Sequence, residues 1–234
     1  MQPPATLDYP RIKVLFVGDA TVGKSCLIKR FCEGRFVNKY IPTIGIDYGV
    51  KKIDINPKKY TDLTHQNNNN NNNNLPLQVR VNFWDVAGSA ECFEIRNEFY
   101  TATQGIILVY DVTSRDSFDH LQQWWEELLD YIPLLNNNNN NNRRPSGPSA
   151  TASTAAGKMV DNNNKAAPPV IVLLGNKCDS SNNNAKRAVS EEEGKKWAAA
   201  HGGIPYYDVS ASEEKNVAES LEYVFYNVLA RFFM

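Results

Sequence analysis

One stretch near the start of the chain constrains its possible folds more than any other feature. Residues 18–25, Gly-Asp-Ala-Thr-Val-Gly-Lys-Ser, fit the pattern G-x-x-x-x-G-K-[ST], a loop whose backbone N–H groups bind phosphate. A strand-like apolar run at 12–17 precedes it, and a helix-like run at 26–31 follows it. The bare pattern arises by accident in about one chain in a hundred of this length, and more rarely between a strand and a helix. We therefore predict a phosphate-binding loop instead of an ordinary glycine turn.

Strand-like and helix-like stretches alternate along most of the chain. Alternation of this kind predicts an α/β fold in which a mostly parallel six-stranded sheet carries helices on both faces. The second and third strand-like runs are separated by residues 56–76, which show no helical pattern. We expect these two runs to form an antiparallel hairpin that carries an insertion. The strand-like runs lie at 12–17, 48–55, 77–84, 105–110, 170–174 and 205–209.

Two helices carry readable start signals. Apolar residues between 118 and 132 keep to one helical face after Thr113 and Asp116, which we expect to act as cap and first-turn acid. Ser190 and Glu193 have the spacing of a capping box, which predicts that another helix starts there.

Low-complexity insertions interrupt the expected domain, which covers residues 11–234 after a short tail at 1–10. Asparagine tracts fall in all three insertions, at places where the pattern already requires a loop. Such tracts bury too little apolar surface to fold, so we expect disordered surface expansions without a function. A regulatory or partner-binding role for the longest insertion stays open. The insertions lie near 56–76, 136–169 and 180–188.

Composition and charge exclude several classes of protein. The 234 residues are 42% apolar with a net charge of -1, and the basic stripe typical of a nucleic-acid binder is missing. Four cysteines are scattered without zinc-ligand spacing, which indicates a reducing, intracellular setting. No stretch reaches the roughly 20 apolar residues of a membrane span. No cysteine follows Cys178 and position 2 is glutamine, so we expect a monomeric, cytoplasmic protein without a lipid anchor.

The phosphate loop needs its residue types for physical reasons. Gly18 and Gly23 allow the close approach that lets N–H groups converge on phosphate oxygens at a helix N-terminus. Lys24 supplies charge to the terminal phosphates, and Ser25 offers a hydroxyl to Mg²⁺. Asp85 ends a strand-like run and can orient the hydration shell of that ion, although a lone strand-end aspartate is as often a cap or turn residue.

A further element indicates which base is bound. Asn176-Lys177-Cys178-Asp179 follows the run at 170–174, at the strand end where ligands collect in such sheets. The Asp179 carboxylate can accept two hydrogen bonds from guanine N1–H and the N2 amino group, a pair of donors that adenine lacks. Ser210-Ala211-Ser212 is placed to offer a backbone N–H to guanine O6. These elements in this order predict a guanine nucleotide.

From about residue 10 onward the chain resembles a Ras-superfamily small GTPase of the Rab-like kind, with a P-loop G-domain fold. Residues 31–50 (FCEGRFVNKYIPTIGIDYGV) and 96–100 (RNEFY) are similar to the RJL subfamily, Rab-like proteins some of which carry an added J domain. No His-Pro-Asp tripeptide follows the last helix-like stretch, so we expect a member without a J domain. The resemblance implies GTP/GDP and Mg²⁺ as cofactors. It also implies effector proteins that bind the first switch (residues 36–48) and the second switch (residues 86–100), with an exchange factor or activator.

The resemblance assigns further roles by matching position. Thr43 would bring its hydroxyl to Mg²⁺ and its N–H to the γ-phosphate, Phe36 would pack on guanine, and Tyr40 would cover the phosphates. Ala87 and Gly88 would begin the second switch, where the Gly88 N–H senses the γ-phosphate. The expected metal ligands are Ser25, Thr43 and Asp85, and the residues expected to act in hydrolysis are Lys24, Thr43, Gly88 and Ser89. The expected nucleotide-binding residues are Gly18, Asp19, Ala20, Thr21, Val22, Gly23, Lys24, Ser25, Cys26, Phe36, Tyr40, Thr43, Asp85, Ala87, Gly88, Asn176, Lys177, Asp179, Ser210, Ala211 and Ser212.

Ser89 departs from the pattern of the superfamily, most of which has a glutamine here that positions the attacking water. Serine is too short for this task, and a misplaced reacting group can cost on the order of 100-fold in rate. Ala20, where many relatives have glycine or serine, is expected to crowd the transition state or an arginine finger. The RJL subfamily is itself thought to dwell in its GTP form. We therefore expect slow hydrolysis.

These features together predict a magnesium-dependent GTP-binding regulatory protein that is largely GTP-loaded and signals through its switches. The alternative is a scaffold that stays GTP-bound without a meaningful GTPase cycle. A small-molecule phosphotransferase is disfavoured because no residues for an acceptor pocket stand out. The subfamily resemblance alone suggests signalling and a flagellar, basal-body or nuclear association.

Overall fold

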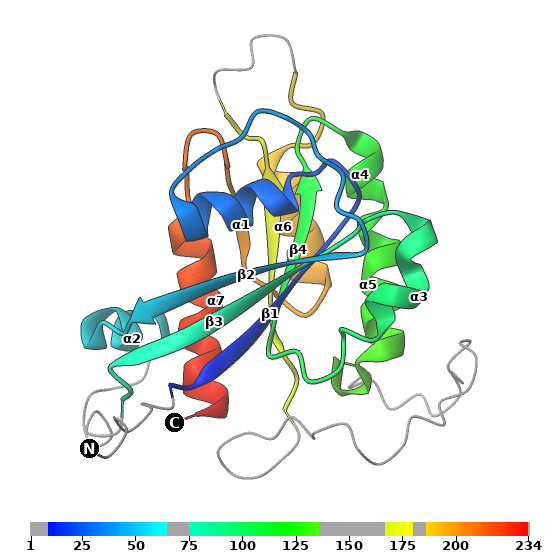
Figure 1. Ribbon diagram of the computed structural model, residues 1–234. Helices are drawn as coiled ribbons and strands as arrows, with labels where there is room; N and C mark the ends of the chain where they lie inside the picture. Colours follow the sequence, from blue (N-terminus) through cyan, green and yellow to red (C-terminus); the bar gives the residue numbers. More distant parts are fainter. Residues whose placement is uncertain (1–8, 65–74, 136–166, 180–185, 234) are drawn as a thin grey trace.

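A six-stranded sheet forms the centre of the protein (Figure 1). The computed structural model describes residues 9–64, 75–135, 167–179 and 186–233. Strand β2 pairs antiparallel with β3, and every other neighbouring pair is parallel. The predicted α/β class, with a mostly parallel sheet and one antiparallel strand, is confirmed. In their order across the sheet the strands are β2 (Ile46–Asp54), β3 (Gln78–Val86), β1 (Arg11–Val17), β4 (Gly105–Asp111), β5 (Val170–Asn176) and β6 (Tyr206–Asp208).

Helices cover both faces of the sheet. Helices α1, α2 and α7 pack on one set of strand side chains, and α4, α5 and α6 pack on the other set. Successive strand residues alternate between the two sets: Val14 and Phe16 face one way, Leu15 and Val17 the other. The helical elements are α1 (Lys24–Glu33), α2 (Pro57–Thr64), α3 (Phe93–Asn97), α4 (Arg115–Asp119), α5 (Leu121–Tyr131), α6 (Glu191–Ala200) and α7 (Val217–Phe232), with short 3₁₀ turns η2 (Ala90–Cys92) and η3 (Pro133–Leu135).

The central strands bring distant parts of the sequence to one edge. Every residue of β4 and β5 is buried, as expected for parallel strands covered on both faces. Because β1, β3, β4 and β5 are parallel, the segments that follow them emerge at the same edge of the sheet. The phosphate loop, the second switch and the segment after Asn176 therefore become neighbours.

Helix α2 contradicts the expectation that no helix separates β2 from β3. Asn56 caps it by accepting hydrogen bonds from two backbone N–H groups of the first turn, at 2.9 and 3.2 Å. Pro57 occupies the first position, where its missing N–H costs little. Tyr60 is buried, and its ring packs against Tyr226 of α7. Helix α2 lies beside α7 (Figure 1). Packing against α7 stabilises a helix too short to show an apolar period in the sequence.

The helical stretch at 118–132 also differs from the expectation. It is divided at His120 into α4 and α5, and its N-cap is Ser114, whose hydroxyl accepts from a backbone N–H one turn later. Thr113 is therefore not the cap, because its own N–H and hydroxyl both donate to the Asp111 carboxylate. Asp116 lies in the first turn, as expected.

Three further expectations concern the capping box, membrane-spanning helices and the asparagine tracts. Both reciprocal hydrogen bonds of the capping box at Ser190 and Glu193 are present at the start of α6. Within the described ranges, no helix is long and apolar enough to cross a membrane. The asparagine tracts at 67–74, 136–142, 162–164 and 182–184 lie outside the described residues.

Candidate functional site

The loop between β1 and α1 has the backbone that its glycines predict. Gly18 (φ +137°) and Gly23 (φ +97°) lie in the region that L side chains rarely adopt. A Cβ on Gly18 would lie 2.1 Å from the carbonyl oxygen of Val109 on β4, so the neighbouring strand leaves no room for a side chain. Thr21 also has a positive φ, of 67°. The tight turn delivers the chain to the N-terminus of α1, where unpaired N–H groups favour anions.

Lys24 reaches back along this loop. Its ammonium group donates to the carbonyl oxygens of Gly18 and Asp19, at 2.7 Å in each case. Burial lowers the pKa of Lys24 to about 8, against the opposing effect of the Asp85 and Asp19 carboxylates. An anion beside Lys24 would offset the cost of burying its charge.

The three predicted metal ligands converge on one point. Ser25 Oγ donates to Asp85 Oδ2, and Thr43 Oγ1 lies 3.1 Å from Ser25 Oγ and 3.2 Å from Asp85 Oδ2. Asp85 is 2% exposed, its pKa is raised by burial, and its buried Oδ1 has no hydrogen-bond partner. Hydroxyl and carboxylate oxygens are the donors Mg²⁺ prefers, completed by water or phosphate oxygens. The residues present therefore fit a magnesium ion.

Asn176 connects the phosphate loop to the loop after β6. Its side chain is buried, with Nδ2 donating to the Val22 carbonyl at 2.7 Å and Oδ1 accepting from the Ala211 N–H at 3.3 Å. A Cβ on Gly23 would lie 2.3 Å from the same Nδ2. The asparagine of the predicted base-reading segment thus contacts protein at both ends of its amide.

Asp179 lies beside the serines of the loop after β6. Ser210 Oγ donates to Asp179 Oδ1 at 2.8 Å and lies 3.1 Å from Ser212 Oγ. Lys177 has a φ of 66°, and its ammonium group lies 2.6 Å from Asp111 Oδ2. The two predicted base-reading segments are therefore in direct contact.

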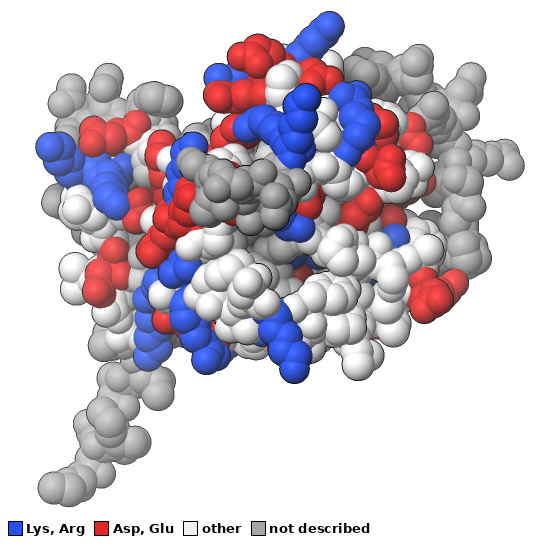
Figure 2. Space-filling view, turned by 90° about the horizontal axis from the view of Figure 1, so that it is seen from above, with Lys and Arg blue, Asp and Glu red and all other residues white. Residues whose placement is uncertain are grey.

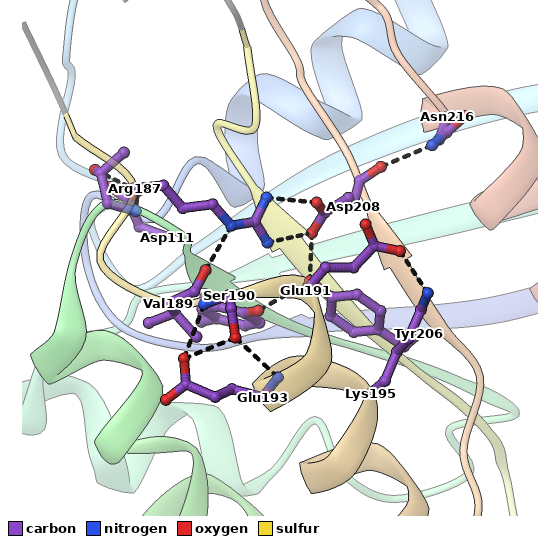
Figure 3. A network of polar contacts seen from close by, with 12 residues as sticks. Asp111, Arg187, Val189, Ser190, Glu191, Glu193, Lys195, Tyr206, Asp208 and Asn216 are labelled. Carbon is purple, nitrogen blue, oxygen red and sulfur yellow. Dashed lines mark hydrogen bonds and ion pairs between the residues drawn. The ribbon is translucent and has the colours of Figure 1, made fainter.

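A network behind these segments was not predicted from the sequence (Figure 3). The Arg187 guanidinium donates to both carboxylate oxygens of Asp208, at 2.5 and 2.9 Å, and to the Val189 carbonyl at 2.6 Å. Tyr206 donates to the same carboxylate, and Asn216 Nδ2 donates to the Asp208 carbonyl at 2.8 Å. The network holds the loop after β6 at both ends, at Asp208 and at Asn216. The spacing of these residues in the sequence did not predict it.

Arg30 of α1 holds the same loop from the opposite side. It donates to the carbonyl oxygens of Ala211 and Ser212, at 2.8 and 3.0 Å. Its guanidinium carbon also lies 5.9 Å from the centre of the Phe36 ring. An arginine on a helix is ordinary in a sequence, so only the structure identifies Arg30 as part of the site.

One cavity of about 630 Å³ receives most of the predicted residues, a volume typical of ligand pockets. Charged side chains of both signs are interspersed over the face that Figure 2 shows, above this edge of the sheet. Lys29, Asn38 and Lys39 line the cavity without having been predicted. The predicted residues that line it are Ala20, Thr21, Gly23, Lys24, Ser25, Cys26, Phe36, Tyr40, Thr43, Ala87, Gly88, Ser89, Asn176, Lys177, Asp179, Ala211 and Ser212. Those that contact the lining residues from behind are Gly18, Asp19, Val22, Asp85 and Ser210.

The second switch begins against the phosphate loop. A Cβ on Gly88 would lie 2.3 Å from the backbone nitrogen of Ala20, so the two segments touch through their main chains. Ser89 Oγ lies 3.3 Å from Cys92 Sγ. The Ser89 carbonyl oxygen accepts from Arg96 at 2.8 Å.

The phosphate loop is also held from α5. Trp124 Nε1 donates to Asp19 Oδ1 at 2.7 Å, and His120 Nδ1 lies 2.7 Å from Asp19 Oδ2. The hydrogen bond with Asp19 raises the pKa of His120. Trp124 is buried in the core, and its indole N–H also holds the phosphate loop through Asp19.

The chain is similar to several curated proteins. DnaJ homolog subfamily C member 27 from Rattus norvegicus and from Mus musculus are each 49% identical to it over 118 residues. The protein of the same name from Homo sapiens is 48% identical over 118 residues. Each match covers 50% of this chain and 36% of the relative, so the chain matches about a third of the length of these relatives. These relatives agree with the resemblance to Rab-like proteins of the RJL subfamily.

The Ras family sequence model matches residues 13–140 and 150–230. These two segments contain the phosphate loop, both switches and the predicted base-reading segments described above. The topology of the sheet and the contacts around the cavity agree with the match. The chain therefore belongs to the Ras family of small GTPases.

Proposed function

We propose that this Ras-family protein is a magnesium-dependent GTP-binding regulator that hydrolyses GTP weakly and stays largely GTP-loaded. The observation that carries the proposal is Ser89, which stands in the place of the water-positioning glutamine in an otherwise complete site. Slow turnover would leave the protein bound to GTP for long periods, so its switches would signal without rapid cycling.

The residues around the cavity would share the work of binding. Lys24 would neutralise the terminal phosphates, Asp179 would accept hydrogen bonds from guanine, and Phe36 would pack on the base. Mg²⁺, held by the three converging oxygen donors, would neutralise charge on the β- and γ-phosphate oxygens. Asn176 and Arg30 would act indirectly, by holding the loops that contact the nucleotide.

Two features support weak hydrolysis. Ser89 has only a short side chain, and its hydroxyl lies 3.3 Å from Cys92 Sγ. Ala20 lines the cavity next to Gly88, where its methyl group would crowd an incoming arginine finger. A partner that supplies both a water-orienting group and an arginine would overcome the two defects together.

Single-turnover GTP hydrolysis by the purified protein tests this proposal. We expect Ser89→Gln to raise the rate by about tenfold or more, because a longer side chain can orient the attacking water. Ala90→Gln adds the same side chain one residue further along and should leave the slow rate unchanged. A wild-type rate equal to that of a glutamine-bearing Ras-family GTPase would refute weak hydrolysis.

The effector surface that we propose spans both switches. The Tyr48 and Trp84 rings lie 4.7 Å apart, and Trp84 and Phe99 lie 5.0 Å apart, which gives an aromatic row across β2, β3 and the second switch. Ile44 of the first switch is 92% exposed, and Ile95 of the second is 50% exposed. Exposed apolar side chains in one area are typical of protein interaction sites. A change in the conformation of the first switch would move Ile44 and so alter this surface directly.

A GTP-bound scaffold is the alternative function. The contacts that hold the second switch against α5 favour this alternative, because a switch fixed by protein contacts would change little during a GTPase cycle. Chemical analysis of the nucleotide that copurifies with the protein separates the two functions. Stoichiometric GTP that no exchange factor displaces supports the scaffold, whereas a GDP/GTP mixture that shifts with an exchange factor supports the regulator.

Location and partners extend the proposal. We propose a cytoplasmic, monomeric protein with effectors and an exchange factor or activator at the switches. The family resemblance suggests a flagellar, basal-body or nuclear association. Imaging of a tagged full chain, together with its sedimentation, would test this extension.

A further inference from the structure

The second switch is fastened to α5 by a buried ion pair. Arg96 Nε and Nη2 donate to the two carboxylate oxygens of Glu127, at 2.6 and 2.7 Å. The two side chains are only 7% and 11% exposed. A bidentate arginine–carboxylate pair has a fixed geometry as well as strong attraction. In Figure 1, α3, which carries Arg96, lies alongside α5, which carries Glu127.

Further side chains of the second switch use the same part of α5. The Tyr100 hydroxyl donates to Glu127 Oε1 at 2.5 Å, and Asn97 Nδ2 donates to the Tyr131 hydroxyl at 3.0 Å. The Tyr100 and Tyr131 rings stack at 5.6 Å. The ion pair is thus the centre of a set of polar and aromatic contacts that spans the second half of the switch.

Arg96 also connects these contacts on α5 to Ser89 and, through Trp124, to the phosphate loop. Its Nη1 donates to the Ser89 carbonyl at 2.8 Å, so it holds the backbone of the residue in the water-positioning place. Its guanidinium carbon lies 4.6 Å from the Trp124 ring, whose N–H donates to Asp19 of the phosphate loop. A chain of direct contacts therefore runs from the phosphate loop through α5 to the second switch.

All of these contacts are made between protein groups, and none needs a phosphate oxygen as a partner. A switch that depends on the Gly88 N–H and the γ-phosphate alone relaxes when that phosphate is lost. A buried, hydrogen-bonded ion pair resists such relaxation, because opening it leaves two charges without partners in a poorly solvated place. Salt screens a buried pair far less than an exposed one.

We propose that Arg96 is a positioning residue that, paired with Glu127, keeps residues 89–100 docked on α5 whichever guanine nucleotide is bound. The conformational change between the GDP and GTP forms is then confined to the first switch. This inference rests on the proposed function for its two nucleotide states. The docking itself depends only on the contacts within the chain.

Hydrogen–deuterium exchange, read by mass spectrometry on the full chain, tests the docking. Wild-type protein loaded with GDP or with a non-hydrolysable GTP analogue should exchange at similar rates over 89–100, while residues 36–45 differ between the two. Glu127→Gln removes the carboxylate charge and should speed exchange over 89–100 by at least about tenfold in the GDP form, since local opening becomes easier. Glu126→Gln makes the same change on the neighbouring, exposed residue of α5 and should match the wild type.

A second variant keeps the inference testable if Glu127→Gln folds poorly. Arg96→Lys retains the positive charge but lacks the planar fork, so it should also free residues 89–100 in the GDP form. The inference is overturned if wild-type residues 89–100 exchange much faster with GDP than with the analogue. It is also overturned if both variants keep wild-type protection there.

Binding of a fluorescent GDP derivative to each protein separates this inference from the proposed function. If the wild type binds no guanine nucleotide, the proposed function fails. The docking is then decided on the nucleotide-free proteins. Faster exchange over 89–100 in both variants than in the wild type upholds it, and equal exchange refutes it.

Discussion

The two switches of this protein are held to the rest of the structure in very different ways. In the first switch, Tyr40 and Ile41 are each 62% exposed and Ile44 is 92% exposed. In the second switch, Arg96 and Tyr100 are buried, and both bind Glu127 of α5. In the first switch, Thr43 joins the predicted metal ligands and mostly exposed residues line the cavity, whereas the second switch is held on α5 through Arg96 and Tyr100.

This difference indicates which of the two segments can change conformation at the lower cost in free energy. A segment with few buried contacts opens at little cost, and a segment anchored by a buried ion pair opens only when much of the local structure does. Residues 36–44 of the first switch are therefore less constrained than the second half of the second switch. The second half of the second switch is attached to α5 by buried side chains. Four experiments test this contrast between the two switches.

The largest effect is expected from Glu127→Ala. It leaves the Arg96 guanidinium buried without its carboxylate, which typically costs about 3–5 kcal/mol of stability. Urea unfolding followed by circular dichroism would measure the change in the free energy of unfolding. Glu126→Ala, on the exposed side of α5, should change that free energy little. Equal effects of the two substitutions would show that the ion pair does not anchor the second switch.

Gly88→Ala is expected to come next. The added Cβ would lie 2.3 Å from the backbone nitrogen of Ala20, so the second switch and the phosphate loop could not keep their contact. We expect nucleotide affinity to fall by about tenfold or more, since one lost hydrogen bond to a charged phosphate is worth about 1.5–3 kcal/mol and 1.4 kcal/mol is tenfold. Ala90→Ser, two residues further on and exposed, is the control. Unchanged affinity of Gly88→Ala in a titration with a fluorescent GDP derivative would contradict the tight junction.

A smaller effect is expected from pH, through Lys24. Burial lowers its pKa to about 8, so free protein loses the ammonium charge as the pH rises through that value. Phosphate binds the charged form, and nucleotide affinity should therefore fall by about fourfold between pH 6.5 and pH 8.5. Fluorescent-nucleotide titrations across this range would measure the fall, and Lys24→Met should show weak binding without the pH dependence. A constant wild-type affinity would mean that Lys24 remains charged throughout.

The smallest effect is expected from Ile44→Ser in the first switch. Ile44 is 92% exposed, and substitutions at such positions usually change stability by less than about 0.5 kcal/mol. Urea unfolding should show this small change, in contrast to the large loss from Glu127→Ala. A loss of several kcal/mol would mean that the first switch is anchored as firmly as the second.

The fold and most of the cavity lining could be predicted from the sequence because their signals are local. The glycines of the phosphate loop and the capping box at Ser190 each specify a conformation within a few residues. Apolar runs identified all six strands. Helix α2 was missed because its start signal at Asn56 lacked an apolar period, and its stability comes from contact with α7.

The partners of charged side chains could not be predicted in the same way. Arg30, Arg96 and Arg187 all hold loops of the site, by hydrogen bonds to carbonyl oxygens or to a carboxylate. The sequence separations of these contacts range from 2 residues, between Arg187 and Val189, to 182, between Arg30 and Ser212. An arginine side chain is long and its sequence context says little about direction, so only the tertiary arrangement selects its partner.

The sequence by itself determined the α/β fold, the phosphate loop and the residues that gather around one edge of the sheet. It did so because backbone conformation and apolar periodicity are properties of short segments. Only the tertiary structure decided that α5 carries Glu127 opposite Arg96 and Trp124 opposite Asp19. Pairing of that kind depends on where helices pack. It anchors the second switch to α5 and leaves the first switch with fewer buried contacts.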